Sequence, residues 1–257
     1  MKVKIEANLK NEDVQFLCKS DNTMGKLINI IGNIEIPIRG NRYESLVKSI
    51  IGQQLSVKAA GTIIGRVEAL CNGITPQSIY NASIDQLRAT GVSKSKINYI
   101  KDLTEKYLSN ELKLELLDHL SNGEVIAELT KIKGIGQWTA EMFLIFSLGR
   151  NNVLSFGDVG LQRACKWLYQ ADKDTNGKEF LAQKSEKWKP YYSIASLYLW
   201  ETVNRDYVVH FKSIADLLSE KGIHLEEAKK PIEDYENLYE ITSSGKIISL
   251  KRKYTRR

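Results

Sequence analysis

The sequence is poor in the residues on which many small folds and metal sites depend. Its 257 residues include three cysteines, three histidines and four prolines. Cys18, Cys71 and Cys165 are odd in number and far apart, and no pair has metal-ligand spacing. We therefore predict reduced thiols, with neither a structural zinc nor an iron–sulfur cluster.

Long apolar runs are absent as well. No run reaches the roughly 18 apolar residues of a membrane-spanning helix. Residues Met1–Lys10 alternate charged and apolar side chains, which is not the pattern of a signal peptide. We expect a soluble intracellular protein without a membrane partner.

Positive charge is in excess. The net charge is +6 and the isoelectric point is about 9.0, which favours association with an anionic partner but does not say which one. A hydrophobic content of 42% and this length are sufficient for one large domain or two smaller ones.

Apolar residues recur at helical spacing along most of the chain. About a dozen short helices are predicted between residues 11 and 221, the last of them at Phe211–Lys221. Ser83–Gln86 has the form of a capping box that opens one of them. Apart from a brief strand or extended arm at Val3–Ile5, strand periodicity is nearly absent before residue 230. The prediction is an all-α fold with two helical lobes.

The C-terminal segment differs in character. Two short β-rich runs, at residues 238–241 and 247–250, flank Ser243–Lys246 and predict a hairpin, which basic residues follow. We predict one domain over residues 1–222, in which the N-terminal and C-terminal segments pack around the middle, and a basic extension over residues 223–257.

A glycine-rich turn joins two helical patterns at Lys133-Gly134-Ile135-Gly136. Glycine permits positive φ and close approach, and a helix that begins near Gln137 would present backbone amides to a phosphate. Thr139 could add a hydroxyl. The alternative is an ordinary helical hairpin that only needs small residues. About twenty residues later, Asp158 lies where another helix should begin, a position suited to capping or to chemistry.

The larger pattern around this turn resembles a known family. The turn occurs within Leu129–Ala140, and Asp158 within Val153–Leu161; further matching segments are Tyr43–Ala60, Gly91–Lys96, Trp188–Tyr191 and Tyr198–Trp200. Together they resemble the helix-hairpin-helix DNA glycosylases, and more narrowly the 3-methyladenine glycosylase type. The resemblance covers roughly residues 25–205 in the family's order.

The resemblance implies roles for individual residues. Asp158 matches the catalytic aspartate, with Ser155 in place of a frequent proline. The implied base pocket contains Trp138, Trp200, Gln54 and Met142; core packing is the alternative for both tryptophans. Bifunctional relatives carry a lysine at the position of Trp138, and an indole cannot form their Schiff base, so base release without strand cleavage is expected.

The resemblance also implies the DNA contacts. They are Lys133, Gly134, Ile135, Gly136, Gln137 and Thr139 at the hairpin, and Ser93, Lys94 and Lys96 at the loop that would help to flip the base. The alternative for the two lysines of that loop is a solvated surface. No cofactor is required, but the carbonyls of Thr130, Ile132 and Ile135 would hold a monovalent cation, Na+ or K+.

The extension resembles a small modular motif found beside homing endonucleases. The implied role is an auxiliary DNA contact through Lys246, Lys251 and Arg252, without nuclease chemistry. The alternative is a basic tail that is flexible or caps the core.

These observations predict a monofunctional glycosylase of base excision repair, with its active site in a cleft between the two helical lobes. It would flip alkylated purines out of double-stranded DNA and hydrolyse their N-glycosidic bonds, acting as a monomer in the nucleoid or, in a eukaryote, in the nucleus. Two alternatives remain at this point: the same fold acting on deaminated or oxidised bases, and a DNA-binding protein without catalysis.

Overall fold

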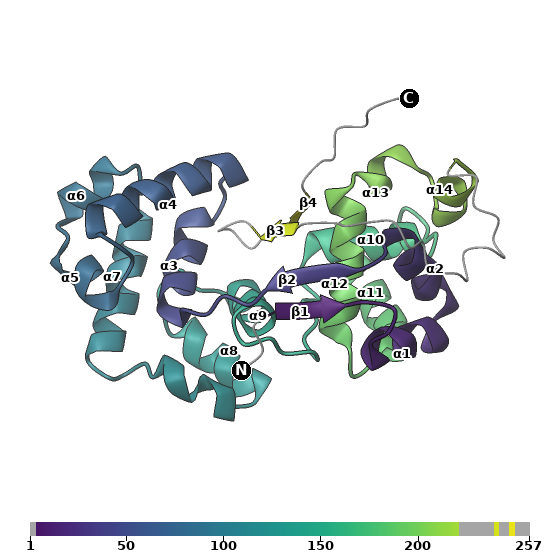
Figure 1. The fold of residues 1–257 in the computed structure, drawn as a ribbon, viewed down its shortest axis with the longest axis horizontal. Coiled ribbons are helices and arrows are strands. Elements are labelled where there is room, and N and C mark those ends of the chain that lie inside the picture. Colours follow the sequence, from purple (N-terminus) through teal and green to yellow (C-terminus); the bar gives the residue numbers. More distant parts are fainter. Residues whose placement is uncertain (1–3, 221–238, 242–246, 250–257) are drawn as a thin grey trace. The chain divides into compact units, whose positions relative to one another are not determined.

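Helices dominate the protein (Figure 1). The computed structural model describes residues 4–220, 239–241 and 247–249, and the predicted all-α fold is confirmed. The chain forms two compact units. The first, here called the terminal unit, comprises Met1–Pro37, Arg150–Glu240 and Ile247–Arg257; the second, the central unit, comprises Ile38–Gly149 and Ile241–Lys246. An active-site cleft between two lobes stays a prediction.

The terminal unit is built around one buried helix. Its elements are β1 (Lys4–Ala7), α1 (Glu12–Ser20), α2 (Asn22–Ile31), β2 (Ile34–Pro37), α10 (Val159–Leu168), α11 (Gly177–Ser185), the 3-10 helix η2 (Glu186–Trp188), α12 (Tyr192–Asn204), α13 (Tyr207–His210) and α14 (Ile214–Glu220). From Tyr192 to Thr202 every residue of helix α12 except Trp200 is buried, as expected for a helix surrounded by protein. It packs against α10 and α2, and Tyr198 donates a hydrogen bond to the Ala7 carbonyl of β1.

Strands β1 and β2 form an antiparallel pair; a brief strand or extended arm was predicted at Val3–Ile5, where β1 begins at Lys4, whereas β2 was not predicted. Ile5 lies opposite Ile36, and Ala7 opposite Ile34, and all four side chains are buried. The alternation of buried and exposed residues is regular, but each strand has only four residues. Four residues that pair with a segment almost thirty positions away are too short to be recognised by periodicity.

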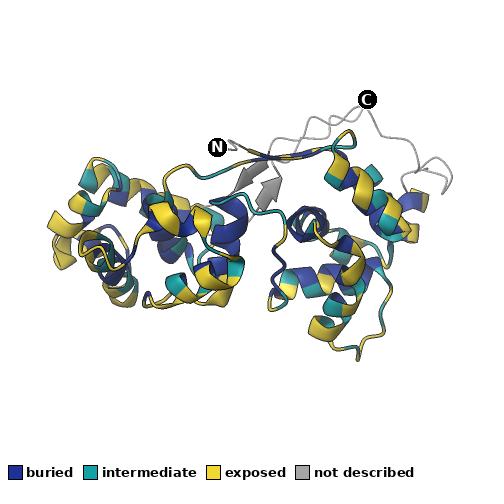
Figure 2. Cartoon of the chain, turned by 90° about the horizontal axis from the view of Figure 1, so that it is seen from below, coloured by how far each residue is buried: buried dark blue, intermediate teal, exposed yellow. Residues whose placement is uncertain are grey.

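The central unit is also helical. Its elements are α3 (Arg42–Gly52), α4 (Val57–Cys71), α5 (Pro76–Asn81), α6 (Ile84–Ala89), α7 (Lys94–Leu108), the 3-10 helix η1 (Leu114–His119), α8 (Asn122–Thr130) and α9 (Gln137–Phe146). The predicted capping box is present at the start of α6, between Ser83 and Gln86. From Thr139 to Phe146 every residue of α9 is buried, so this helix is the core of the central unit. Many of the other helices combine buried and exposed residues (Figure 2).

Two local predictions were made near the C-terminus. The helix predicted at Phe211–Lys221 is present as α14, but it begins three residues later, at Ile214, after α13 has ended at His210. The later start has a local cause, because Ser213 Oγ accepts the Asp216 amide and Asp216 accepts the Lys212 amide, which together start the helix. The two runs predicted as a hairpin form strands β3 (Tyr239–Ile241) and β4 (Ile247–Ser249), which pair with each other.

Candidate functional site

The predicted helical hairpin is formed by α8, the turn Lys131–Gly136 and α9. Helix α9 starts after Gly136, which has an extended backbone and contributes no side-chain cap. The first backbone amides of a helix have no acceptor within the helix, and its N-terminus carries a partial positive charge. An anion is therefore a suitable partner for the start of α9.

Gly134 is the residue that the turn requires. Its φ is +80°, and a Cβ at this position would lie only 2.1 Å from Cδ2 of the Tyr99 ring. The neighbouring Ile135 amide donates to the Ile132 carbonyl across the turn at 3.1 Å. Gly136 differs, because its φ is −92° and no atom lies within 4 Å of an added Cβ. Its small size is thus not needed by the fold.

The first residues of α9 divide into exposed and buried side chains. Trp138 is 41% exposed, and Gln137 donates to the carboxylate of Glu141 at 2.8 Å. Thr139 and Met142, in contrast, are buried. Only Gln137 and Trp138 therefore present much side-chain surface at this end of the helix. Roles for Thr139 in DNA binding and for Met142 in a base pocket stay predictions.

The α3–α4 turn and the loop before α7 carry the remaining predicted residues of the central unit. Gln54 is exposed and has a φ of +57°. Ser93 caps α7, and Lys94 is exposed in its first turn. The Lys96 ammonium donates to the Ile51 and Gln53 carbonyls, at 2.8 and 2.6 Å, and partial burial lowers its pKa. Lys96 is thus engaged with the end of α3, and its phosphate contact stays a prediction.

The proposed cation ligands lie at the end of α8 and in the turn. Thr130 is the last residue of α8, so its carbonyl accepts no hydrogen bond from an amide within the helix. The Ile132 carbonyl accepts one hydrogen bond and retains a second lone pair. These neutral backbone oxygens suit a hard cation of low charge. Among the described residues no group of three or more His, Cys, Asp or Glu side chains could hold a metal ion.

In the terminal unit, Asp158 is the N-cap of α10. Its Oδ1 accepts the Leu161 amide at 2.8 Å, and its own amide donates to the Ser155 carbonyl at 3.1 Å, which closes a tight turn. The residue is 9% exposed. The carboxylate is thus oriented by its own backbone and lies at the positive end of a helix.

The turn that carries Asp158 contains an unusual buried hydroxyl. Ser155 is fully buried, and its Oγ is the one buried side-chain polar atom without a hydrogen-bond partner among the residues that the structure describes. Gln162 supports the same turn, because its amide donates to the Phe156 carbonyl at 2.7 Å. The turn is held by backbone and glutamine contacts, so the substitution of proline by Ser155 leaves the carboxylate in place.

Trp200 lies close to Asp158. A Cβ added at Gly160 would be 3.0 Å from Asp158 Oδ1 and 3.9 Å from Trp200 Cδ1, so both side chains border the space above this glycine. Between Tyr192 and Thr202, Trp200 is the one residue of α12 that is not fully buried. The structure therefore brings a carboxylate and a partly accessible indole together.

Comparison with known proteins identifies the family. The sequence profile of the HhH-GPD superfamily of base excision DNA repair proteins matches residues 47–190, more than half of the chain. The chain belongs to this superfamily.

Two relatives that are 42% and 35% identical to this chain support the assignment. A crystal structure of a DNA-3-methyladenine glycosidase from Bacillus halodurans is 42% identical, with a TM-score of 0.76, and the match covers 84% of this chain and 99% of that one. DNA-3-methyladenine glycosylase 1 of Schizosaccharomyces pombe is 35% identical over 193 residues, 71% of this chain and 82% of the relative.

A third comparison involves DNA. The structure of the Schizosaccharomyces pombe 3-methyladenine DNA glycosylase Mag1 in complex with abasic DNA is 33% identical to this chain, with a TM-score of 0.65. The match covers 75% of this chain and 96% of that one.

The matched HhH-GPD region, residues 47–190, includes the hairpin, Trp138 and Asp158, whereas Trp200 and the C-terminal extension lie beyond it.

The far end of α10 in this HhH-GPD protein is held by a buried cluster that the sequence did not indicate. The Asp21 carboxylate caps α2 and accepts hydrogen bonds from the Tyr169 hydroxyl at 2.6 Å and the Trp188 indole at 3.2 Å. Burial, and then the contact with Asp21, raise the pKa of Tyr169, which keeps its proton on the hydroxyl. This cluster fixes the end of the helix that begins at Asp158.

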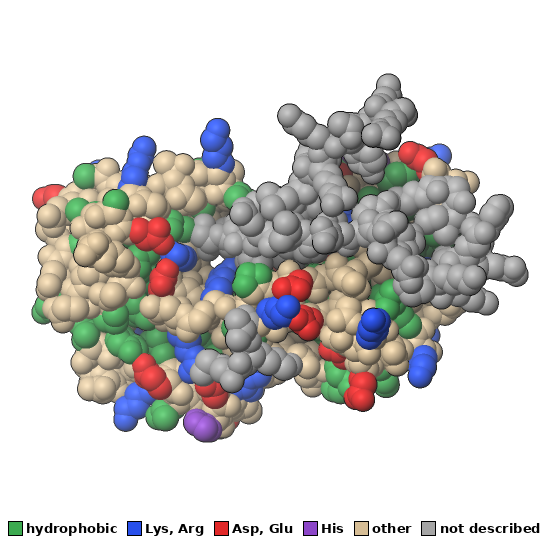
Figure 3. Space-filling view, in the orientation of Figure 1, with side chains coloured by type: hydrophobic (Ala, Val, Ile, Leu, Met, Phe, Trp, Pro, Cys, Tyr) green, Lys and Arg blue, Asp and Glu red, His purple; other side chains and the backbone are tan. Residues whose placement is uncertain are grey.

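The remaining predictions concern charge and the extension. Lys and Arg side chains are interspersed with Asp and Glu on the surface in view (Figure 3). Lys246, Lys251 and Arg252, predicted as auxiliary DNA contacts, lie outside the described residues. No helix in the described part of the chain has the length and apolar character needed to cross a membrane.

Proposed function

We propose that this HhH-GPD protein is a hydrolase that releases alkylated purines of the 3-methyladenine and 7-methylguanine type from DNA. The observation that carries this function is the Asp158 carboxylate, capped into α10 beside the Trp200 indole. The relatives named DNA-3-methyladenine glycosylase support it, since the match spans most of their length and of this chain.

The reaction needs one well-placed carboxylate. Alkylation makes the purine cationic, so the base leaves as a neutral molecule when the C1′–N bond breaks and its electron pair departs with the base. The sugar becomes an oxocarbenium-like cation. Asp158 would stabilise that cation and orient a water molecule, whose oxygen then bonds to C1′ while its proton is released. A leaving group that already carries positive charge requires no second acid.

The two tryptophans are suited to an alkylated base. An indole face attracts a flat cation through stacking and cation–π contact, and Trp138 and Trp200 both keep accessible surface. Gln54 and Met142 complete the pocket in this proposal. Because Trp138 stands where a lyase needs an amine, the enzyme would be monofunctional and leave an abasic site.

DNA is the partner, and the hairpin is its backbone contact. The amides at the start of α9, the exposed Lys133 ammonium and Lys94 would bind phosphates without regard to sequence. The carbonyls of Thr130, Ile132 and Ile135 would hold a monovalent cation, which supplies further positive charge to the phosphate. We also propose that the enzyme acts as a monomer, in the nucleoid or nucleus where its substrate is.

A base-release assay tests this function. The protein is incubated with separate duplexes that contain 3-methyladenine, 7-methylguanine, hypoxanthine, 8-oxoguanine or uracil, and half of each sample is then treated with alkali. Strand breaks at the methylated purines, seen only after alkali, are expected. Breaks without alkali would contradict the monofunctional mechanism, and release of only hypoxanthine, 8-oxoguanine or uracil would contradict the alkylated substrate. DNA binding without release of any base would identify a binding protein.

A further inference from the structure

The turn Lys131–Gly136 is held from outside by α7. The Lys133 backbone amide donates to Asp102 Oδ2 at 3.0 Å, although 31 residues separate the two. Three residues earlier on α7, the Tyr99 ring occupies the space where any side chain at residue 134 would begin. Residues three apart lie on one face of a helix. One face of α7 therefore contacts two consecutive residues of the turn.

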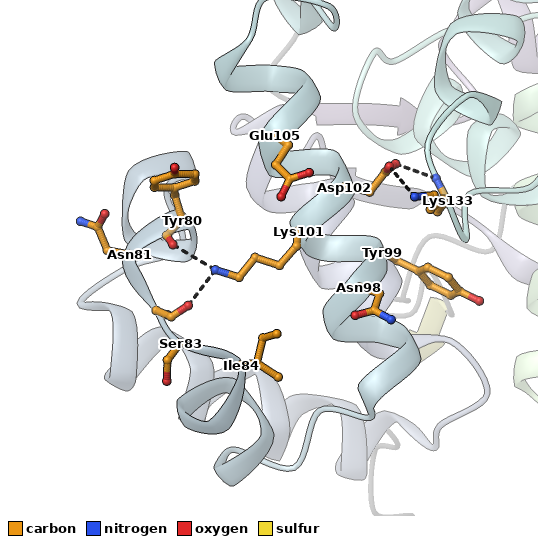
Figure 4. A pocket seen from close by; sticks show the side chains of 11 residues that line it. Tyr80, Asn81, Ser83, Ile84, Asn98, Tyr99, Lys101, Asp102, Glu105 and Lys133 are labelled. Carbon is orange, nitrogen blue, oxygen red and sulfur yellow. Dashed lines mark hydrogen bonds and ion pairs between the residues drawn. The ribbon is translucent and has the colours of Figure 1, made fainter.

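Figure 4 shows which side chains of α7 face the turn and which point away from it. Asp102 and Tyr99 lie on the side of the helix toward Lys133, whereas Lys101 and Glu105 point away from the turn. The Lys101 ammonium donates to the Ile79, Tyr80 and Ala82 carbonyls, so it fastens α7 to α5. The helix is thus anchored on one side and supports the turn on the other.

A second route connects α7 to the same turn. Gln53 donates its side-chain amide to the Gly134 carbonyl at 2.8 Å, and Lys96 of α7 donates to the Gln53 carbonyl. The turn is therefore bonded at the Lys133 amide and at the Gly134 carbonyl, on either side of the residue with positive φ. These two bonds fix the direction in which the following amides point.

Asp102 is well suited to hold a backbone amide. Partial burial raises the pKa of its carboxyl, but the hydrogen bonds from the Lys133 amide and the Lys106 ammonium outweigh this effect, and the pKa lies below its usual range. Its Oδ1 is 2.9 Å from the Lys106 ammonium and 3.4 Å from that of Lys133. The Lys133 side chain is nevertheless 72% exposed, so its ammonium can turn to a phosphate while its backbone amide stays on Asp102.

We propose, resting on the hairpin's proposed role in DNA binding, that Asp102 and Tyr99 are positioning residues that aim the amides of the turn and of α9 at the DNA backbone. They act through Lys133 and Gly134 and touch no substrate. Loss of the Asp102 contact keeps the Gln53 hydrogen bond to Gly134 but releases the Lys133 amide, so affinity for DNA falls while the chemistry at Asp158 is unchanged.

The test uses three full-length variants of α7, with an undamaged duplex for affinity and a duplex that contains 3-methyladenine for base release. Asp102→Ala removes the acceptor for the Lys133 amide, and Asp102→Asn keeps an acceptor oxygen but removes the charge. Glu105→Ala is the matched control, because it removes one negative charge from the same helix, one helical turn from Asp102, at a side chain that points away from the turn. Dissociation constants are measured at fixed salt, together with single-turnover base release at saturating enzyme and the temperature of unfolding.

Asp102→Ala is expected to weaken DNA binding about 10-fold. Asp102→Asn is expected to weaken it about 3-fold or less, since the side-chain oxygen can still accept the hydrogen bond from the Lys133 amide. Glu105→Ala should bind within about 2-fold of the wild type. Single-turnover release should be unchanged in all three. Wild-type affinity in Asp102→Ala, equal weakening in Asp102→Asn, or equal weakening in Glu105→Ala would each overturn the proposal.

Two further measurements keep the outcome decisive. If Asp102→Ala is unfolded at the assay temperature, Tyr99→Leu replaces it, because this change removes the flat ring over Gly134 and keeps Asp102. Weaker binding of about 3-fold is then expected, and wild-type binding would overturn the proposal. If the wild type releases no alkylated base, the proposed function fails; the duplex affinities still test Asp102 independently.

Discussion

Helices α9 and α10 begin in opposite ways. Helix α9 follows Gly136, which contributes no side chain to its own N-terminus, so its first amides need a partner from outside the helix. Helix α10 follows Asp158, whose carboxylate accepts the Leu161 amide of the same helix. The first arrangement is suited to binding an anion. The second places a negative charge at a helix terminus, and it is suited to stabilising a cation.

The turns before α9 and α10 also differ in which residues hold them in place. The turn before α9 is held by side chains from α7 and from the α3–α4 turn, which are distant in sequence. The turn before α10 is held largely by its own residues, through the Ser155 carbonyl and Gln162. In the proposed function, the DNA-binding turn would thus be oriented by tertiary contacts and the catalytic turn by local ones.

Removing the charge at the start of α10 should have the largest effect. Asp158→Asn keeps a good N-cap, so the free energy of unfolding should change by less than about 0.5 kcal/mol. The amide cannot stabilise the sugar cation, and single-turnover base release should fall at least about 100-fold. Duplex affinity measured on the same sample should match the wild type. Release at a wild-type rate would remove Asp158 from catalysis.

Changing the turn before α9 should act on stability. Gly134→Ala places a residue at a φ of +80° and a Cβ within the Tyr99 ring, so the free energy of unfolding should fall by about 2 kcal/mol or more. Gly136→Ala is the matched control, with ordinary φ and open space, and its free energy of unfolding should fall by less than about 1 kcal/mol, since alanine is only a poorer N-cap than glycine. Chemical denaturation measures the free energy of unfolding of both variants. Equal destabilisation would contradict the distinct roles of the two glycines.

The smallest effect is expected at Gly160, the second residue of α10. Gly160→Ala should raise stability by up to about 1 kcal/mol, because alanine favours helix. The new Cβ lies 3.0 Å from Asp158 Oδ1, so the carboxylate must shift, and we expect single-turnover base release to fall about 3-fold.

Gly123→Ala is the control for this change. Gly123 is the second residue of α8 and has no atom within 4 Å of an added Cβ. The same gain in stability is expected, with no change in the rate of base release. A slower rate in Gly123→Ala, or an unchanged rate in Gly160→Ala, would break the link between the space at Gly160 and the position of Asp158.

Much of the fold could be predicted because helices depend on neighbouring residues. The spacing of apolar residues placed most helices within a few positions, and Ser83 and Gln86 predicted the start of α6. The exceptions have local or distant causes. Ser213 and Asp216 delay the start of the predicted helix to Ile214, and β2 depends on its pairing with β1, which is distant in sequence.

The sequence predicted the residues of the candidate site that would contact DNA or the sugar, but not the residues that hold them in place. Asp158 and the Gly134 turn were evident from sequence, and the placement of Asp158 before α10 agrees with that prediction. Asp102, Tyr99 and Gln53 were not singled out, because nothing local distinguishes an aspartate and a tyrosine on a helix, or a glutamine in a turn, until their partners are known. The cluster of Asp21, Tyr169 and Trp188 escaped for the same reason.

The sequence by itself determined what happens within one helical turn. Gly134 can adopt positive φ, and Asp158 can cap the helix that follows it, because the atoms involved are at most a few residues apart. Only the tertiary structure decided that Asp102 accepts the Lys133 amide and that Trp200 lies beside Asp158. Such contacts join residues 31 or more positions apart, and they form only when buried helices such as α9 and α12 fix the distances between them.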